Sequence, residues 1–148
     1  MKNLLSLSLL AISVLAFSCK KDEVAMNPDK IYQVSTSLSG ANELPMVSTS
    51  ATGTTTGTYN QTTKMLTVST TLNGITPTAG HIHTQAVPTN ASKSGGVTFP
   101  FTSLMSPISF TTMLTTAQET DLLNGIMYVN FHTPANPGGE MRGNLMVK

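Results

Sequence analysis

Tryptophan is absent from the 148-residue sequence, cysteine occurs once, and only 10% of the residues carry a charge. A single cysteine excludes an internal disulfide bond, and the lack of tryptophan removes an aromatic platform on which sugar rings commonly stack. Arginine also occurs once, as Arg142, and the lysines form no basic cluster. Because binding to a phosphate backbone needs several clustered cations, we expect no nucleic-acid partner.

Recognisable catalytic motifs are missing as well. The sequence contains no nucleophile elbow, phosphate-binding loop, CxxC pair or His-Glu helix motif. Serine is abundant, but no serine has the spacing to a base and a third orienting group that would activate a nucleophile. These absences favour a binding or structural protein over an enzyme.

The N-terminus carries a pattern typical of export. Lys2 precedes an apolar run from Leu4 to Phe17, and a small serine stands directly before Cys19. The run is too short to span a bilayer, so the pattern predicts a lipoprotein signal peptide over residues 1–18. The stretch LAFSC resembles a lipobox, and SCKKDE resembles the start of many bacterial lipoproteins. The resemblance implies lipid attachment at Cys19 and a membrane contact through that lipid, with the outer membrane of a bacterial cell envelope as the expected location.

The rest of the chain divides into a tether and one domain. Residues 19–30 are charged and lack periodicity, which predicts a lipidated tether. Residues 31–148 are of the size of a single domain. Without Lys2 the seven remaining basic residues balance seven acidic ones, so the expected mature chain has no net formal charge.

Alternating side chains predict an all-β domain. In KMLTVSTTL the residues Leu66, Val68 and Leu72 face one way and the intervening residues face the other. A period of two over this length indicates half-buried antiparallel strands. Short strands separated by turn residues favour an immunoglobulin-like antiparallel sandwich or barrel. The expected strands cover residues 31–38, 51–59, 64–72, 80–84, 97–101, 108–114, 126–132 and 140–147.

One short helix and one close approach between strands are also expected. In LTTAQETDLLNG, Thr115 and Gln118 have the spacing of a capping box, and Gly125 ends the helix. Gly53 and Gly57 lie on one face of an expected strand. Glycines in a strand indicate a bulge or a neighbouring strand that approaches closely.

Three longer stretches resemble the CHRD domain. They are LSGANELPMVSTSATGTTTGTYN, LTVSTTLNGITPTAGHIHT and LLNGIMYVNFHTPANPGGEMRGNL, and they run from about residue 35 to residue 145. The sequence departs from the family pattern at Leu44, Met46 and Thr84, where the family often has valine, proline and glycine. The resemblance implies an immunoglobulin-like β-sandwich or barrel outside the cytoplasm, with no established enzymatic activity.

The three histidines are placed so that they can converge. His81 and His83 flank Ile82, so both face away from the core if Ile82 faces inward. His132 directly follows Phe131, so it also faces away from the core if Phe131 faces inward. A hairpin after His132 would bring Glu140 close to it. We therefore predict a metal site in which the three imidazoles are ligands and Glu140 is a fourth or outer group. Imidazole nitrogen suits zinc and copper.

A structural role for the same residues is the alternative. In that interpretation the histidines donate to loop carbonyls, Glu140 pairs with Arg142, and the loop after His132 is held in place. Glu43 either reaches this end of the domain or satisfies backbone amides in a turn. A dinuclear dismutase site needs more metal ligands than three histidines and one glutamate can provide. We therefore reject dismutase activity.

Two functional hypotheses follow. The first is a lipid-anchored module that binds an unidentified protein or small molecule or serves a structural purpose, with a metal that rigidifies one end. The second is a small zinc or copper metalloprotein with redox or metal-handling activity.

Overall fold

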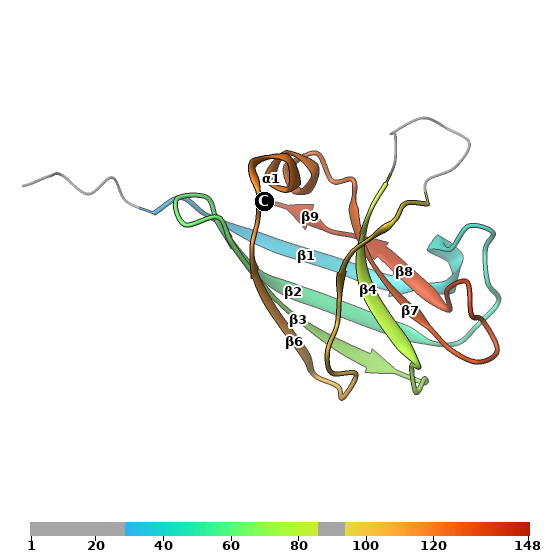
Figure 1. Ribbon diagram of the computed structural model, residues 1–148. Helices are drawn as coiled ribbons and strands as arrows, with labels where there is room; N and C mark the ends of the chain where they lie inside the picture. The colour runs from blue at the N-terminus through green and yellow to red at the C-terminus, as the bar shows by residue number, and fades with distance from the viewer. Residues whose placement is uncertain (1–28, 86–93) are drawn as a thin grey trace, which may run out of the picture.

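Antiparallel strands form one curled sheet in the computed structural model, which describes residues 29–85 and 94–148 (Figure 1). A short 3-10 helix, η1 (Gly40–Asn42), follows the first strand, and one α-helix, α1 (Thr116–Leu123), lies between β6 and β7. The all-β fold with one short helix is therefore confirmed. The strands are β1 (Ile31–Ser39), β2 (Thr52–Asn60), β3 (Met65–Asn73), β4 (Ala79–Thr84), β5 (Val97–Pro100), β6 (Ile108–Met113), β7 (Met127–His132), β8 (Met141–Asn144) and β9 (Met146–Val147).

The sheet has the strand order β5-β4-β7-β8-β1-β2-β3-β6, and β9 also pairs with β1. In Figure 1, β4, β7 and β8 cross over β1, β2 and β3, while β6 lies to the left of them. Side chains from both groups of strands belong to one buried cluster, so the sheet curls over its own inner face. This arrangement is the one expected of a sandwich or barrel.

The inner face of the sheet follows the alternation of the sequence. Leu66 and Val68 are almost fully buried on β3, and Ile82 is fully buried on β4. The β4–β7 register aligns Ile82 with Val129, which is also fully buried. Because successive side chains of a strand point to opposite faces, the neighbours of Ile82 must point outward. The core includes Val34, Leu38, Tyr59, Leu66, Val68, Ile82, Ile108, Leu122, Met127, Val129, Phe131, Met141 and Leu145.

The expected last strand, 140–147, is interrupted at Leu145. This side chain is fully buried, and its backbone N–H donates to the carbonyl of Met127 at 2.9 Å. Beyond it, Met146 and Val147 pair with β1. Anchoring Leu145 in the core thus separates the strand into β8 and β9.

Phenylalanines join the two ends of the strand order. Strands β5 and β6 stand at opposite ends, but the ring centroid of Phe110 lies 5.5 Å from those of both Phe99 and Phe101. Phe101 also contacts the core through Phe131, with the centroids 5.6 Å apart. We call Phe99, Phe101 and Phe110 the aromatic seam, because packing of their side chains closes the curl.

Helix α1 has the expected ends. The hydroxyl of Thr115 accepts from the Gln118 N–H at 3.3 Å, and the Gln118 side chain accepts from the Thr115 N–H at 2.9 Å. Gly125 has a φ of +68° just after the last turn, a conformation that glycine adopts without a steric penalty. The capping box and the glycine terminus are both confirmed.

The expected close approach occurs at Gly57. This residue pairs with Val68 on β3, and a Cβ added to Gly57 would lie 2.0 Å from the backbone oxygen of Thr67. Backbone oxygen cannot yield as a flexible side chain can. The position therefore requires glycine.

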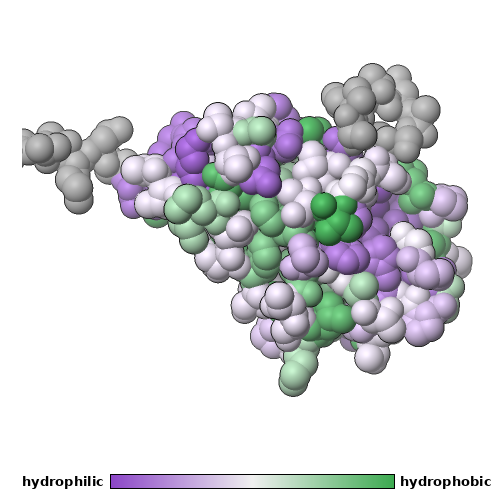
Figure 2. Space-filling view, viewed as in Figure 1, coloured by the Kyte–Doolittle hydropathy of each residue, from purple (hydrophilic) through white to green (hydrophobic). Residues whose placement is uncertain are grey.

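The exposed surface mixes polar and apolar residues. On the face seen in Figure 2, apolar residues form several separate areas between polar ones. Among residues 29–85 and 94–148, no helix has the length and apolar character needed to cross a bilayer. The expected signal peptide (1–18), Cys19 and most of the expected tether lie outside the described residues.

Candidate metal centre

Two neighbouring strands place the three histidines on the outer face of the sheet. Strand β4 carries His81 and His83 on either side of the buried Ile82. Strand β7 ends at His132, which is aligned with Ala79 of β4, two residues before His81. Side chains two residues apart on a strand share a face, so all three imidazoles lie over the same part of the sheet.

The three rings converge. Their centroids are 5.0 Å apart for His81 and His132, 5.3 Å for His81 and His83, and 6.3 Å for His83 and His132. One nitrogen of each ring lies within 4.8 Å of the corresponding nitrogens of the other two. The structure thus brings together the three histidines that the sequence singled out.

One pair of nitrogens already has the spacing of metal ligands. His81 Nδ1 and His132 Nε2 are 3.2 Å apart. With metal–nitrogen distances of about 2.0 Å, two ligands of a tetrahedral ion lie about 3.3 Å apart. The third nitrogen, from His83, lies within 4.8 Å of the ligand nitrogens of the other two rings.

Backbone carbonyls determine which nitrogens are available. His83 Nδ1 donates to the carbonyl of Gly95 at 2.9 Å, and His132 Nδ1 donates to the carbonyl of Pro137 at 3.0 Å. A carbonyl can only accept, so in the neutral form of each ring the proton lies on Nδ1 and the lone pair on Nε2. His132 Nε2 then accepts from His81 Nδ1. Histidines that bind metals commonly donate their other N–H in this way.

The Nε2 atom of His83 is buried and has no hydrogen-bond partner within the described residues. Leaving such an acceptor unsatisfied costs about 1–3 kcal/mol. A metal ion at the convergence point would satisfy it.

The surroundings keep two of the rings neutral. Burial lowers the pKa of His81, and the neighbouring His132 and His83 lower it further. Burial also lowers the pKa of His83, against the opposing effect of its hydrogen bond to Gly95. Only the neutral imidazole can coordinate a metal, so these shifts favour ligation at neutral pH.

A stack of three side chains holds His83 in place. The ring of Tyr128 lies against that of His83, with centroids 4.9 Å apart and planes 7° apart. The Arg142 guanidinium carbon lies 4.2 Å from the Tyr128 ring centroid, within the range of a cation–π contact. The Tyr128 hydroxyl also accepts from the Gly95 N–H at 3.1 Å. Sequence reasoning missed Tyr128, although its alternation with Met127 and Val129 already placed it on the face of His132.

Glu140 lies at the expected point of the backbone but not in the group of three. Its N–H donates to the Phe131 carbonyl at 2.7 Å, which confirms the hairpin. Its carboxylate accepts from Thr133 Oγ1 at 2.7 Å and from Asn136 Nδ2 at 2.5 Å. Hydrogen bonds from Thr49, Asn136 and Thr133 hold the Glu140 pKa below its usual value. The Glu140 carboxylate therefore stabilises the loop whose Pro137 carbonyl accepts from His132. The pairing of Glu140 with Arg142 stays a prediction.

Glu43 reaches the same face of the sheet. Its Oε1 accepts from Asn130 Nδ2 at 2.8 Å, and only 5% of the residue is exposed. Burial raises the Glu43 pKa, and the charge of Arg142 opposes the rise. Asn130 is aligned with His81 on one side and Arg142 on the other. Glu43 therefore supports the residues around the histidines and lies outside the group itself.

The arrangement suits one ion. Within the described residues, His81, His83 and His132 form the group of side chains that could hold a metal. Three neutral nitrogens match the ligands of a mononuclear zinc or copper site. His81 and His132 are only half-buried, so a fourth position on such an ion would face solvent.

The family of the chain is defined by comparison with known proteins. The CHRD domain model matches residues 34–145, and the chain belongs to this family. The match includes all three histidines, Glu43, Glu140 and Arg142. Neither a curated protein nor a solved structure matches the chain.

Proposed function

We propose that this CHRD domain is an extracytoplasmic binding or structural module that holds one zinc or copper ion between His81, His83 and His132. The observation that carries the proposal is the convergence of three ring nitrogens, one from each histidine, within 4.8 Å of one another. His83 Nε2 is in addition buried and has no hydrogen-bond partner within the described residues. The hydrogen bonds to Gly95 and Pro137 place the protons of neutral His83 and His132 on Nδ1. An ion would take the place of the proton that His81 Nδ1 and His132 Nε2 share. The three nitrogen donors, and the hydrogen bonds that orient two of their rings, suit a resident ion.

The ion would join segments that are remote in the sequence. His81 and His83 belong to β4, His132 ends β7, and Pro137 lies in the following loop. An ion that binds the folded chain stabilises it by about 4 kcal/mol when its free concentration is about 1,000 times Kd. We infer that the ion rigidifies this end of the domain.

Metal titration tests the proposal. Protein stripped with a chelator is expected to bind about one zinc or copper ion per chain and to gain roughly 10 °C in Tm at saturation. Isothermal titration calorimetry gives the stoichiometry, and thermal unfolding gives the shift in Tm. If neither ion binds, or if binding leaves Tm unchanged, the proposal is wrong.

A redox copper protein is the second candidate. The half-buried His81 and His132 would leave an open position on the ion, and copper with an open position reacts with small molecules. Such a protein would show a copper spectrum that changes with reductant. A colourless zinc site favours the structural module instead.

We also propose that the domain is anchored to the bacterial envelope through lipid on Cys19. The lipobox-like LAFSC and the preceding apolar run support this location. A cell that expresses the protein is expected to incorporate a labelled fatty acid into it, and the Cys19→Ala variant should lose the label and leave the membrane fraction. Equal labelling of both proteins would contradict the anchor. The partner that the anchored module binds would be an unidentified protein or small molecule.

A further inference from the structure

One further polar side chain lies among the three histidines. Strands β4 and β7 are paired in register, and their outward side chains form three rows: Ala79 with His132, His81 with Asn130, and His83 with Tyr128. His132 and His83 belong to the two outer rows, and each has a ring nitrogen within 4.8 Å of one on His81, in the middle row. Asn130 is the other residue of the middle row, where the Cβ atoms of paired residues lie about 5 Å apart. The ring nitrogens therefore converge beside Asn130.

Asn130 lies nearer to the sheet than the imidazole rings do. Only 4% of Asn130 is exposed, whereas His81 and His132 are half-buried. An asparagine side chain is also shorter than a histidine side chain. The Asn130 amide is therefore on the sheet side of the three rings, opposite the side that faces solvent.

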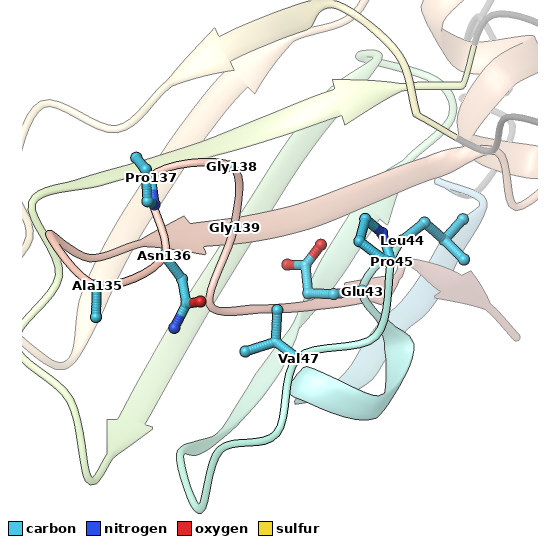
Figure 3. Close-up of a pocket in the computed structure, with 9 residues that line it drawn as sticks. All are labelled: Glu43, Leu44, Pro45, Val47, Ala135, Asn136, Pro137, Gly138 and Gly139. Atoms are coloured by element: carbon cyan, nitrogen blue, oxygen red, sulfur yellow. The ribbon is translucent and has the colours of Figure 1, made fainter.

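The nitrogen of the Asn130 amide is held by Glu43. It donates to Glu43 Oε1 at 2.8 Å, and a carboxylate oxygen can only accept, which fixes the orientation of the amide. Glu43 lies away from the histidines, beside a pocket of about 220 Å³ between residues 44–47 and 135–139 whose lining contains none of the three (Figure 3). Figure 3 shows the Glu43 side chain extending toward Gly139 in this loop.

The oxygen of the amide faces the other way. Glu43 directly follows η1, where Asn42 donates to the carbonyl of Arg142 on β8 at 3.0 Å. Since β8 and β4 lie on opposite sides of β7, an amide nitrogen directed toward Glu43 leaves Oδ1 directed toward β4 and its histidines. Asn130 Oδ1 is buried and has no hydrogen-bond partner within the described residues. Such an acceptor is uncommon in a folded protein and indicates a missing ligand.

We propose that Asn130 Oδ1 is a further ligand of the ion held by His81, His83 and His132, on the sheet side of that ion. The inference rests on the proposed metal site. Two buried acceptors on this face, His83 Nε2 and Asn130 Oδ1, have no partner within the described residues, and one cation satisfies both. The ligands are then three imidazole nitrogens and one amide oxygen, and the solvent-facing position of the ion stays open.

An amide oxygen changes which ion the site prefers. Imidazole suits both zinc and copper, soft sulfur ligands select Cu(I), and carbonyl oxygen suits harder divalent ions. A carbonyl oxygen added to three imidazoles therefore favours Cu(II) over Cu(I). Weak axial ligands of this kind also tune the reduction potential of copper in proteins.

Asn130→Leu tests this ligand. The variant keeps the three histidines and removes the oxygen with little change in side-chain size. We expect it still to bind one ion, with an affinity for Cu(II) at least tenfold lower and an affinity for Cu(I) within a few-fold of the original. Competition with chromophoric chelators gives both affinities, with Cu(I) measured anaerobically. A tenfold fall in their ratio corresponds to a rise of about 59 mV in the reduction potential of the bound copper.

The possible results separate this inference from the proposed function. An unchanged Cu(II) affinity in Asn130→Leu overturns the role of Asn130 and leaves the three-histidine site intact. An equal fall in both affinities shows a structural role of Asn130 and also overturns the inference. If the unaltered chain binds no ion, the metal site and its further ligand are both wrong.

Asn144→Leu is the matched control. Asn144 lies on β8, aligned with Tyr128, and its Nδ2 donates to the Gly125 carbonyl at 2.8 Å. The variant makes the same exchange of asparagine for leucine one strand farther from the histidines of β4. We expect it to keep both copper affinities within a few-fold. A change equal to that of Asn130→Leu would contradict a specific role of Asn130.

Cobalt bound to the unaltered chain covers the case in which Asn130→Leu fails to fold. Three histidines and one solvent molecule give a tetrahedral ion, and the Asn130 oxygen adds a fifth ligand. Five-coordinate Co(II) absorbs visible light more weakly than tetrahedral Co(II). We expect the weaker, five-coordinate spectrum. An intense tetrahedral spectrum overturns the proposal.

Discussion

His81→Ala is expected to lower the affinity for zinc or copper by at least about 100-fold, because it removes one of three ligands and replacements in the outer shell alone already cost 10–100-fold. The ring contacts described for His81 are with His83 and His132. Its removal should therefore affect the ion more than the fold. The change is measured by competition with a chromophoric chelator. An affinity within a few-fold of the original would contradict the three-histidine site.

Glu140→Gln is the matched control for this experiment. The sequence suggested Glu140 as a fourth ligand, but the described carboxylate contacts are with Thr133, Asn136 and Thr49. We expect this variant to keep its metal affinity within a few-fold and to lose about 1–2 kcal/mol of stability, because hydrogen bonds to a charged group are weakened. If Glu140→Gln loses the metal as His81→Ala does, the carboxylate is a ligand after all.

Gly57→Ala is expected to lower the free energy of unfolding by about 3 kcal/mol, the upper part of the range for overpacking. The added Cβ would lie 2.0 Å from the Thr67 oxygen and 2.7 Å from the Val68 Cα. Since both atoms belong to the backbone of β3, the two strands must separate locally. Urea unfolding followed by circular dichroism measures the loss.

The same substitution at Gly138 separates this steric effect from the general effect of removing a glycine. A Cβ at Gly138 meets no atom within 4 Å. Gly138→Ala should therefore change stability by no more than about 0.5 kcal/mol. Similar losses in the two variants would show that the contact with β3 is not the cause.

Much of the fold follows from local periodicity. Alternation along β3 and β4 places Leu66, Val68 and Ile82 inward, and all three are buried. The same alternation is enough to put His81 and His83 on the opposite face. The capping box at Thr115 was also readable, because it depends on residues only three positions apart.

The remaining features depend on contacts between distant segments. Alternation gives the face of a side chain but not its rotamer, so the Glu140 backbone was placed correctly while its carboxylate lies with Thr133 and Asn136. The stack of Tyr128 on His83 depends on the pairing of β4 with β7. The pocket at Glu43 depends on two loops about ninety residues apart in the sequence, and no local pattern contains that information.

The aromatic seam is the place at which the domain can open locally without unfolding. Rings of Phe99, Phe101 and Phe110 join β5 to β6, the two ends of the described strand order. Dispersion between rings is weakly directional, unlike a ladder of backbone hydrogen bonds. The curled sheet can therefore open locally between β5 and β6 at a lower free energy than global unfolding. Solvent deuterons would then reach the edge strands well before they reach β1, which is paired on both sides.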